Sequence, residues 1–222
     1  MYQLLKAGEE AYLAAGEAIR QGKVIVAPTD AVYALLCDAN NPDAVARLRE
    51  IRQSPTDKPL SLIIDIKDID TYCQIRHEAY GDMMRALLPG KVSFLLHKKG
   101  PVFEAAVPND SVCVFWQDNE TRHIYRQNDL VLAISSANLA SQPEATTVEQ
   151  AIEYFGDAVP LYIDSGEERG SKGTLQLDMR TDPVRVMRES PMMPLSEVSR
   201  ILMTRNIHVP IASVREAAAS RS

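Results

Sequence analysis

The sequence predicts one α/β or α+β domain, because helical and strand-like segments are mixed throughout its 222 residues. Amphipathic spacing predicts helices at residues 8–21 and 42–53, and the short apolar run between them, residues 23–27, is typical of a buried strand. No change in composition marks a linker, and no internal repeat is present. A chain of this length can therefore build one two-layer core.

Each expected element rests on a local signal. Gly22 follows the first helix, and Asn41 with Pro42 provides an N-cap and a first helical residue for the second. A Pro-Gly pair at residues 89–90 ends a long, mostly helical stretch. We expect strands at residues 60–66, 91–97, 112–116, 130–135, 161–164, 174–179 and 184–188, and helices at 69–88, 148–155 and 195–203.

Composition excludes several classes of protein. Apolar residues make up 45% of the chain, which excludes a disordered tail protein, and the net charge of −6 argues against coating nucleic acid by charge alone. No stretch reaches the ~18 apolar residues of a membrane helix, and the charged N-terminus has no signal-peptide core. Three scattered cysteines suit reduced thiols. We therefore expect a cytoplasmic protein that contacts no membrane, as a monomer or homodimer.

Several common chemistries lack their motifs. The glycines between Gly166 and Gly173 do not have Walker A spacing, and neither G-x-G-x-x-G nor G-x-S-x-G occurs. The four histidines are isolated, so no pair has metal-ligand spacing and no resident metal site is expected.

Four polar segments follow predicted strands or a helix, where α/β folds usually bind ligands. They centre on Thr29, on the loop from Arg52 to Lys58, on the pair Ser136 and Asn138, and on Arg188. Taken singly, each also fits an ordinary turn or a solvated loop.

Together, and in this order, these segments resemble the YrdC-like family of threonylcarbamoyl-AMP synthases, and in particular its YciO-type paralogues. The resemblance covers residues 8–190 and leaves residues 191–222 as a helical extension and tail. It is carried by PTDAVYALLCDA (28–39), RQSPTDKPLSLI (52–63), LPGKVSFLL (88–96), ISSANLASQPEATTVEQ (134–150), DSGEERGSKGTLQLD (164–178) and VRVMRES (184–190).

The resemblance implies a twisted mixed sheet with helices around a large concave cleft. It implies that ATP, bicarbonate and an amino acid give a carbamoyl adenylate and pyrophosphate, for threonylcarbamoyladenosine modification of tRNA. Mg²⁺ would enter with ATP, held mainly by phosphates and water. RNA and tRNA-modification proteins are further expected partners. By similarity, Arg52, Ser136 and Asn138 are catalytic; these three with Lys58 and Arg188 bind the nucleotide; and Thr29, Tyr33 and Thr174 bind the substrate.

Five positions depart from the family pattern, mainly on the amino-acid side. Ser54 and Phe115 stand where the family has cations, Ala31 where it has a hydroxyl, Ala34 where it has glycine, and Gly173-Thr174 replaces Ser-Thr. These changes indicate an altered substrate or a lost activity.

Two alternatives therefore stay open. One is a non-catalytic paralogue that binds nucleotide or double-stranded RNA along a groove containing Arg52, Lys58, Lys91, Arg169, Lys172 and Arg188. The other is a carbamoyl-phosphate-processing domain. Such domains usually occur with further domains, for which 222 residues leave too little room.

Overall fold

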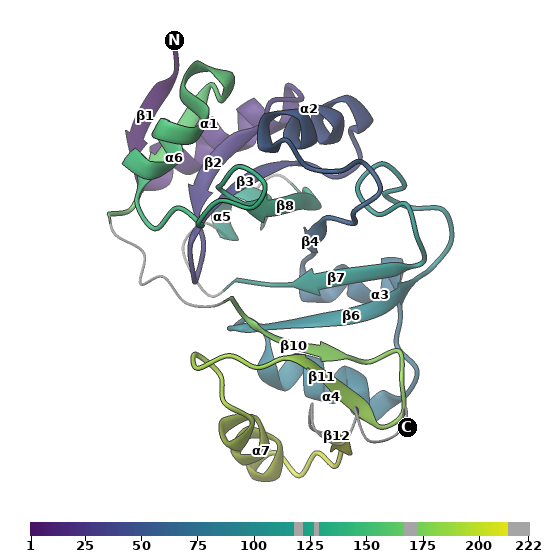
Figure 1. The fold of residues 1–222 in the computed structure, drawn as a ribbon. Helices are drawn as coiled ribbons and strands as arrows, with labels where there is room; N and C mark the ends of the chain where they lie inside the picture. Colours follow the sequence, from purple (N-terminus) through teal and green to yellow (C-terminus); the bar gives the residue numbers. More distant parts are fainter. Residues whose placement is uncertain (118–121, 127–128, 167–172, 213–222) are drawn as a thin grey trace.

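The computed structural model describes residues 1–117, 122–126, 129–166 and 173–212 (Figure 1). Within them, 12 strands form one mixed sheet in the order β1-β9-β2-β3-β8-β4-β7-β6-β10-β11-β12, with β5 paired to β6. The strands are β1 Gln3–Lys6, β2 Ile25–Pro28, β3 Tyr33–Asp38, β4 Ser61–Ile63, β5 Cys73–Gln74, β6 Val92–Lys98, β7 Ser111–Phe115, β8 Leu132–Ser136, β9 Leu161–Asp164, β10 Leu175–Asp178, β11 Val184–Arg188 and β12 Ile211–Ala212.

Helices cover this sheet, with α1, α2 and α6 around the β1–β3 end and α4 and α7 around the β10–β12 end (Figure 1). α1 packs against α5, α2 against β3, and α4 against α7. The α-helices are α1 Glu9–Arg20, α2 Pro42–Arg52, α3 Ile69–Tyr72, α4 Glu78–Leu87, α5 Arg122–Arg126, α6 Val148–Phe155 and α7 Leu195–Thr204, and 3₁₀ turns occur at Ile66–Asp68 and Gly156–Ala158. The mixed α/β class predicted from the sequence is confirmed.

Local sequence signals explain the ends of the best-predicted helices. The Asn41 side chain accepts hydrogen bonds from the backbone N–H groups of Asp43 and Ala44, which caps α2, and Pro42 is its first residue. The Thr147 hydroxyl caps α6 by accepting from the backbone N–H of Gln150. Capping of this kind is local, so the sequence alone could place both helix starts.

The sheet joins distant parts of the chain. β3 pairs antiparallel with β2 on one side and with β8 on the other. In contrast, β4 pairs parallel with β7, and β6 pairs parallel with β10. β3, which lies between β2 and β8 in the sheet, is almost wholly buried. Its apolar residues follow a Pro-Thr-Asp turn and were not predicted to form a strand.

Two expected elements were wrong in extent. Residues 69–88 form no continuous helix, because Cys73 and Gln74 pair with Lys98 and His97 of β6 and so separate α3 from α4. The strand expected at residues 60–66 covers only Ser61–Ile63 before the chain enters a 3₁₀ turn. In the first case, tertiary pairing overrides helix propensity.

Residues outside the family-like segment also join the sheet. β1 pairs parallel with β9, and β12 pairs parallel with β11. In the described part of the chain, no helix is long and apolar enough to cross a membrane. Cys37 and Cys73 are buried, and burial raises the pKa of each thiol to about 12, while Cys113 is partly exposed.

Candidate functional site

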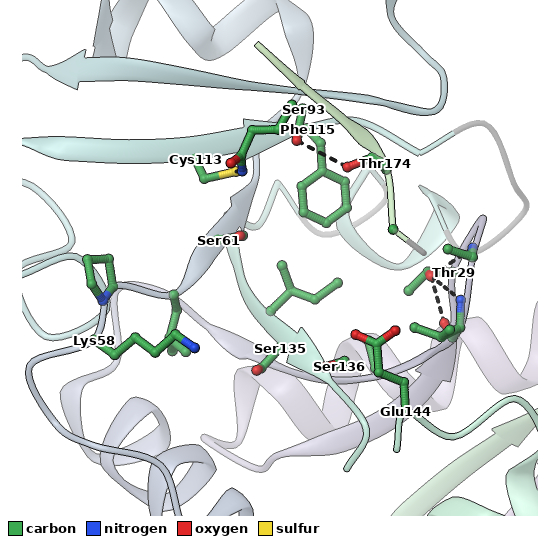
Figure 2. Close-up of a pocket in the computed structure, with 18 of the residues that line it drawn as sticks. Thr29, Lys58, Ser61, Ser93, Cys113, Phe115, Ser135, Ser136, Glu144 and Thr174 are labelled. Carbon is green, nitrogen blue, oxygen red and sulfur yellow. Dashed lines mark hydrogen bonds between the residues drawn. The ribbon is translucent and has the colours of Figure 1, made fainter. Parts of the chain in front are cut away.

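A cavity of about 350 Å³ lies on the face of the sheet between β3 and β11. Figure 2 shows side chains entering it from several strands and from the loops that follow them. Its lining consists of Thr29, Ala31, Val32, Ala34, Arg49, Arg52, Ser54, Lys58, Pro59, Leu60, Ser61, Ser93, Cys113, Phe115, Ile134, Ser135, Ser136, Glu144, Gly173, Thr174, Gln176 and Arg188.

Strand register explains why small and polar residues form the floor of this cavity. Ser61 of β4 lies beside Ile134 of β8 and Cys113 of β7. Two residues along, Phe115 lies beside Ser93 of β6, which in turn lies beside Gln176 of β10. Residues two apart on a strand share a face, so these side chains line one concave surface. Among them, Ser61, Ser93 and Gln176 were not predicted as site residues from the sequence.

Arg52 and Ser136 meet at one wall of the cavity. The Arg52 guanidinium donates long hydrogen bonds to the Ser136 carbonyl (3.4 Å) and to the Ser136 hydroxyl (3.5 Å). Burial lowers the pKa of Arg52, and the nearby Glu144 carboxylate acts in the opposite direction. An arginine stays charged at neutral pH regardless. This wall therefore presents a loosely held cation to a ligand.

Asn138 lies behind that wall and does not line the cavity. Its side-chain oxygen accepts from the Ser136 hydroxyl at 2.7 Å, and its amide nitrogen donates to the carbonyls of Leu139 and Gln142. Asn138 as a whole residue is 4% exposed. These bonds orient the Ser136 hydroxyl and shape the loop after β8.

Arg49 holds the loop that carries Lys58. Its guanidinium donates to four carbonyls, those of Pro55 (2.9 Å), Lys58 (2.6 Å), Ala105 (3.2 Å) and Ala106 (3.2 Å). Arg49 is thus a structural clamp, although it touches the cavity. The Lys58 side chain is exposed and, within the described residues, makes no hydrogen bond or ion pair, so it can reach an anion.

Arg188 and Thr174 form a second polar wall. The Arg188 guanidinium donates to the Thr174 carbonyl at 3.0 Å and to its hydroxyl at 3.3 Å. The Thr174 hydroxyl donates to that of Ser93 at 3.1 Å. Gly173 allows this approach, because its φ is +78° and an added Cβ would lie 2.9 Å from the Arg188 guanidinium carbon.

Thr29 lines the cavity, whereas Tyr33 does not. The Thr29 hydroxyl donates to the Val32 carbonyl at 2.6 Å and accepts from the N–H groups of Ala31 and Val32, so it fixes the turn between β2 and β3. Tyr33 is fully buried and its hydroxyl donates to the carbonyl of Gly166 at 2.8 Å. Tyr33 therefore anchors the start of the loop after β9.

The cavity brings together six of the eight residues predicted from the sequence: Thr29, Arg52, Lys58, Ser136, Thr174 and Arg188. All five positions that depart from the family pattern also line it: Ala31, Ala34, Ser54, Phe115 and Gly173. The Ser54 hydroxyl is buried and has no hydrogen-bond partner in the described residues, so a ligand could engage it. Arg169 and Lys172, expected in an RNA groove, lie outside the described residues.

Comparison with known proteins identifies the family. The Sua5/YciO/YrdC family model, described as "Telomere recombination", matches residues 17–190. The chain belongs to the Sua5/YciO/YrdC family. The crystal structure of Pyrococcus abyssi Sua5 complexed with L-threonine has a TM-score of 0.82, with 25% identity, and covers 96% of this chain and 62% of that one. The crystal structure of E. coli YciO has a TM-score of 0.76, with 23% identity, and covers 86% of this chain and 97% of that one; it supports the fold.

Curated members of the Sua5/YciO/YrdC family carry a functional name. The threonylcarbamoyl-AMP synthase of Pyrococcus abyssi is 27% identical over 193 residues, covering 86% of this chain but only 56% of that protein. The threonylcarbamoyl-AMP synthase of Vibrio campbellii is 30% identical over 160 residues, covering 69% of this chain and 85% of that protein. The chain thus spans about half of the longer relative and most of the shorter one.

Proposed function

We propose that this protein is a carbamoyl-adenylate synthase of the threonylcarbamoyl-AMP type. The amine of an amino acid would combine with bicarbonate to give a carbamate and water. A carbamate oxygen would then attack the α-phosphorus of ATP and displace pyrophosphate. The expected product is an aminoacyl-carbamoyl adenylate, which in the cytoplasm would supply threonylcarbamoyladenosine modification of tRNA.

One observation carries this proposal: three cations, Arg52, Lys58 and Arg188, line one cavity together with a row of hydroxyl groups. They come from a helix end, a loop and a late strand that are up to 136 residues apart in the sequence (188 − 52). Such a set suits a polyphosphate ligand, because charge-assisted hydrogen bonds to phosphate are strong. The curated names of the relatives support the same class of ligand.

The proposed chemistry needs positioning and charge neutralisation rather than a protein nucleophile. We assign Arg52 and Ser136 to the reacting phosphate and carbamate, because they meet at one wall. Lys58 would contact the outgoing pyrophosphate. Arg188 would hold the nucleotide with Thr174 at the opposite wall, and Asn138 would act by orienting the Ser136 hydroxyl. Thr29 and Tyr33 would shape the substrate side through the turn and the loop that they fix.

Mg²⁺ would enter with the nucleotide. In the described part of the chain, no group of three or more His, Cys, Asp or Glu side chains could hold a metal ion. An ion bound mainly by phosphate oxygens and water fits this lining, since Mg²⁺ keeps several waters when it binds nucleotides. When bound, it would neutralise part of the phosphate charge.

The direct test measures pyrophosphate release from ATP with Mg²⁺, bicarbonate and a panel of amino acids, with mass spectrometry of the adenylate product. We expect release with at least one amino acid. We expect Arg52→Met to lower the rate by about 10²-fold. Arg47→Met is the matched control, because Arg47 lies on the exposed face of the same helix, where it pairs with Glu50.

The alternatives give different outcomes. Pyrophosphate release with none of the amino acids would refute the proposal. Tight ATP binding without turnover would then favour a non-catalytic nucleotide-binding protein. Salt-dependent affinity for double-stranded RNA, also without turnover, would favour an RNA-binding one.

A further inference from the structure

A carboxylate and an aromatic ring enter the cavity from opposite walls. Figure 2 shows Glu144 pointing inward from the loop after β8, and Phe115 pointing inward from the end of β7. Both residues line the cavity. Neither a carboxylate nor a phenyl ring offers a hydrogen-bond donor or a positive charge to phosphate. Both therefore indicate a different ligand group.

The backbone at Glu144 is held in place, and its side chain has no hydrogen-bond or ion-pair partner among the described residues. The neighbouring Ala145 is buried, its N–H donates to the Ala137 carbonyl at 3.1 Å, and its carbonyl accepts from the Tyr33 N–H at 2.9 Å. Glu144 itself is exposed and makes no hydrogen bond or ion pair within the described residues, although its charge acts on Arg52. The fold thus fixes the backbone of an exposed carboxylate that lines the cavity and forms no ion pair within the described residues.

A phosphate group is a poor neighbour for this carboxylate. Two like charges within a few ångströms repel each other, and the repulsion grows as a ligand excludes water. Because the Glu144 charge already acts on Arg52, the polyphosphate is expected to lie toward Lys58 and on the side of Arg52 remote from Glu144. The group beside Glu144 should be a cation.

The ring of Phe115 itself can receive a cation or a neutral group. Phe115 lies between Ser93 of β6 and Ile63 of β4, and Cys113 precedes it on the same face. These three side chains are uncharged, and the Arg188 guanidinium farther along this wall is already engaged by Thr174, which bonds Ser93. An aromatic ring face attracts an ammonium group placed within about 6 Å of its centre.

We infer that Glu144 and Phe115 form the subsite for the ammonium group of the amine substrate. The inference rests on the proposed function, because it names the residues that select one of the three reactants. The carboxylate would accept hydrogen bonds from the ammonium, and the ring would cover its other side. The remainder of the substrate would extend toward the hydroxyl groups of the cavity floor.

This role predicts where the kinetic effect falls. The amine enters as R–NH₃⁺ and, with HCO₃⁻, becomes R–NH–COO⁻ with loss of one water and one proton to solvent. The nitrogen is then neutral, so Glu144 holds the entering amine better than the reacting carbamate. Removing its charge should therefore raise KM for the amino acid more than it lowers kcat.

The experiment compares Glu144→Gln with wild type and with Glu149→Gln, an exposed carboxylate on α6 outside the cavity lining. Calorimetric titration with amino acids, in the presence of a non-hydrolysable ATP analogue and Mg²⁺, measures amine binding directly. Steady-state kinetics separates KM from kcat. Thermal melting checks that each variant is folded.

We expect Glu144→Gln to weaken amino-acid binding about tenfold or more, since it removes a charge-assisted hydrogen bond. Affinity for the ATP analogue should stay unchanged or rise. Phe115→Leu should weaken amino-acid binding several-fold, and Glu149→Gln should change neither affinity. A purely structural role for Glu144 would lower both affinities together.

Three results would overturn the inference. One is amino-acid affinity of Glu144→Gln within twofold of the Glu149→Gln control. Another is a Mg²⁺-dependent loss of ATP affinity in Glu144→Gln, which would assign the carboxylate to the metal of the nucleotide. The third is that wild type binds none of the amino acids. If wild type binds an amino acid through Glu144 but releases no pyrophosphate, only the proposed function fails.

Discussion

Arg49 offers the sharpest test of how the fold builds the cavity. The substitution Arg49→Met keeps much of the side-chain volume but removes all donors to four backbone carbonyls. Two of these carbonyls belong to the exposed residues Pro55 and Lys58, where water can replace the guanidinium, whereas Ala106 is fully buried. The change should therefore act on both stability and the loop that carries Lys58.

The size of the effect follows from these four bonds. A buried acceptor left without a partner costs about 1–3 kcal/mol, and hydrogen bonds to charged groups contribute about 1.5–3 kcal/mol. Allowing for rehydration at the exposed carbonyls, we expect a loss of about 3–5 kcal/mol in the free energy of unfolding. This is a large share of the 5–15 kcal/mol that is typical of a domain.

Urea denaturation followed by circular dichroism measures the loss. With a slope of about 3 kcal/mol/M, the midpoint should fall by about 1–1.7 M. Arg47→Met is the control on the same helix; its exposed pair with Glu50 should contribute less than about 0.5 kcal/mol. A loss below about 1 kcal/mol in Arg49→Met, or one equal to that of the control, would show that the clamp does not hold the loop.

Three further predictions follow from other contacts. Gly173→Ala should destabilise the protein by about 1–2 kcal/mol, since an alanine at φ +78° is strained and its Cβ meets Arg188. A calorimetric melt indistinguishable from that of wild type would contradict this. Cys113 should react with a thiol reagent in the native state well before the two buried cysteines, and ATP should slow the reaction; peptide mass mapping measures both. The hydrogen bond from Lys6 holds the pKa of the Asp164 carboxyl below its usual 3.8. The ionised carboxylate therefore stabilises the fold above about pH 4, and this stabilisation is lost as pH falls through the lowered pKa of the folded protein. Asp164→Asn should accordingly lose less melting temperature than wild type on acidification from pH 5 to 2, and equal losses would contradict it.

Helix caps, turns and short apolar runs in the sequence were sufficient to predict the elements whose ends depend on neighbouring residues. The strands at 161–164 and 184–188 have the predicted bounds, and α2 begins at the predicted cap. Short strands that depend on distant partners could not be recognised in this way. Cys73 and Gln74 are a strand only because β6 lies beside them, and pairing of this kind leaves no periodicity in two residues.

The same distinction applies to the site. The resemblance to the family indicated Arg52, Ser136 and Arg188, which the cavity brings together. It could not distinguish a lining side chain from one that supports the lining, so Asn138 behind the wall looked like a direct ligand. It also missed Glu144, because a carboxylate in a Pro-containing loop has the composition of any solvated turn.

The parallel pairing of β1 with β9 has a consequence for synthesis of the protein. Gln3 pairs with Leu161, 158 residues later (161 − 3). A ribosome adding about 5–20 residues per second needs roughly 8–30 s to make that stretch. During this time the first strand has no partner, and Arg188 of the cavity wall has not yet been made. Nascent chains should therefore be unable to bind ligand, and the backbone N–H and C=O groups of β1 lack their strand partner until β9 emerges.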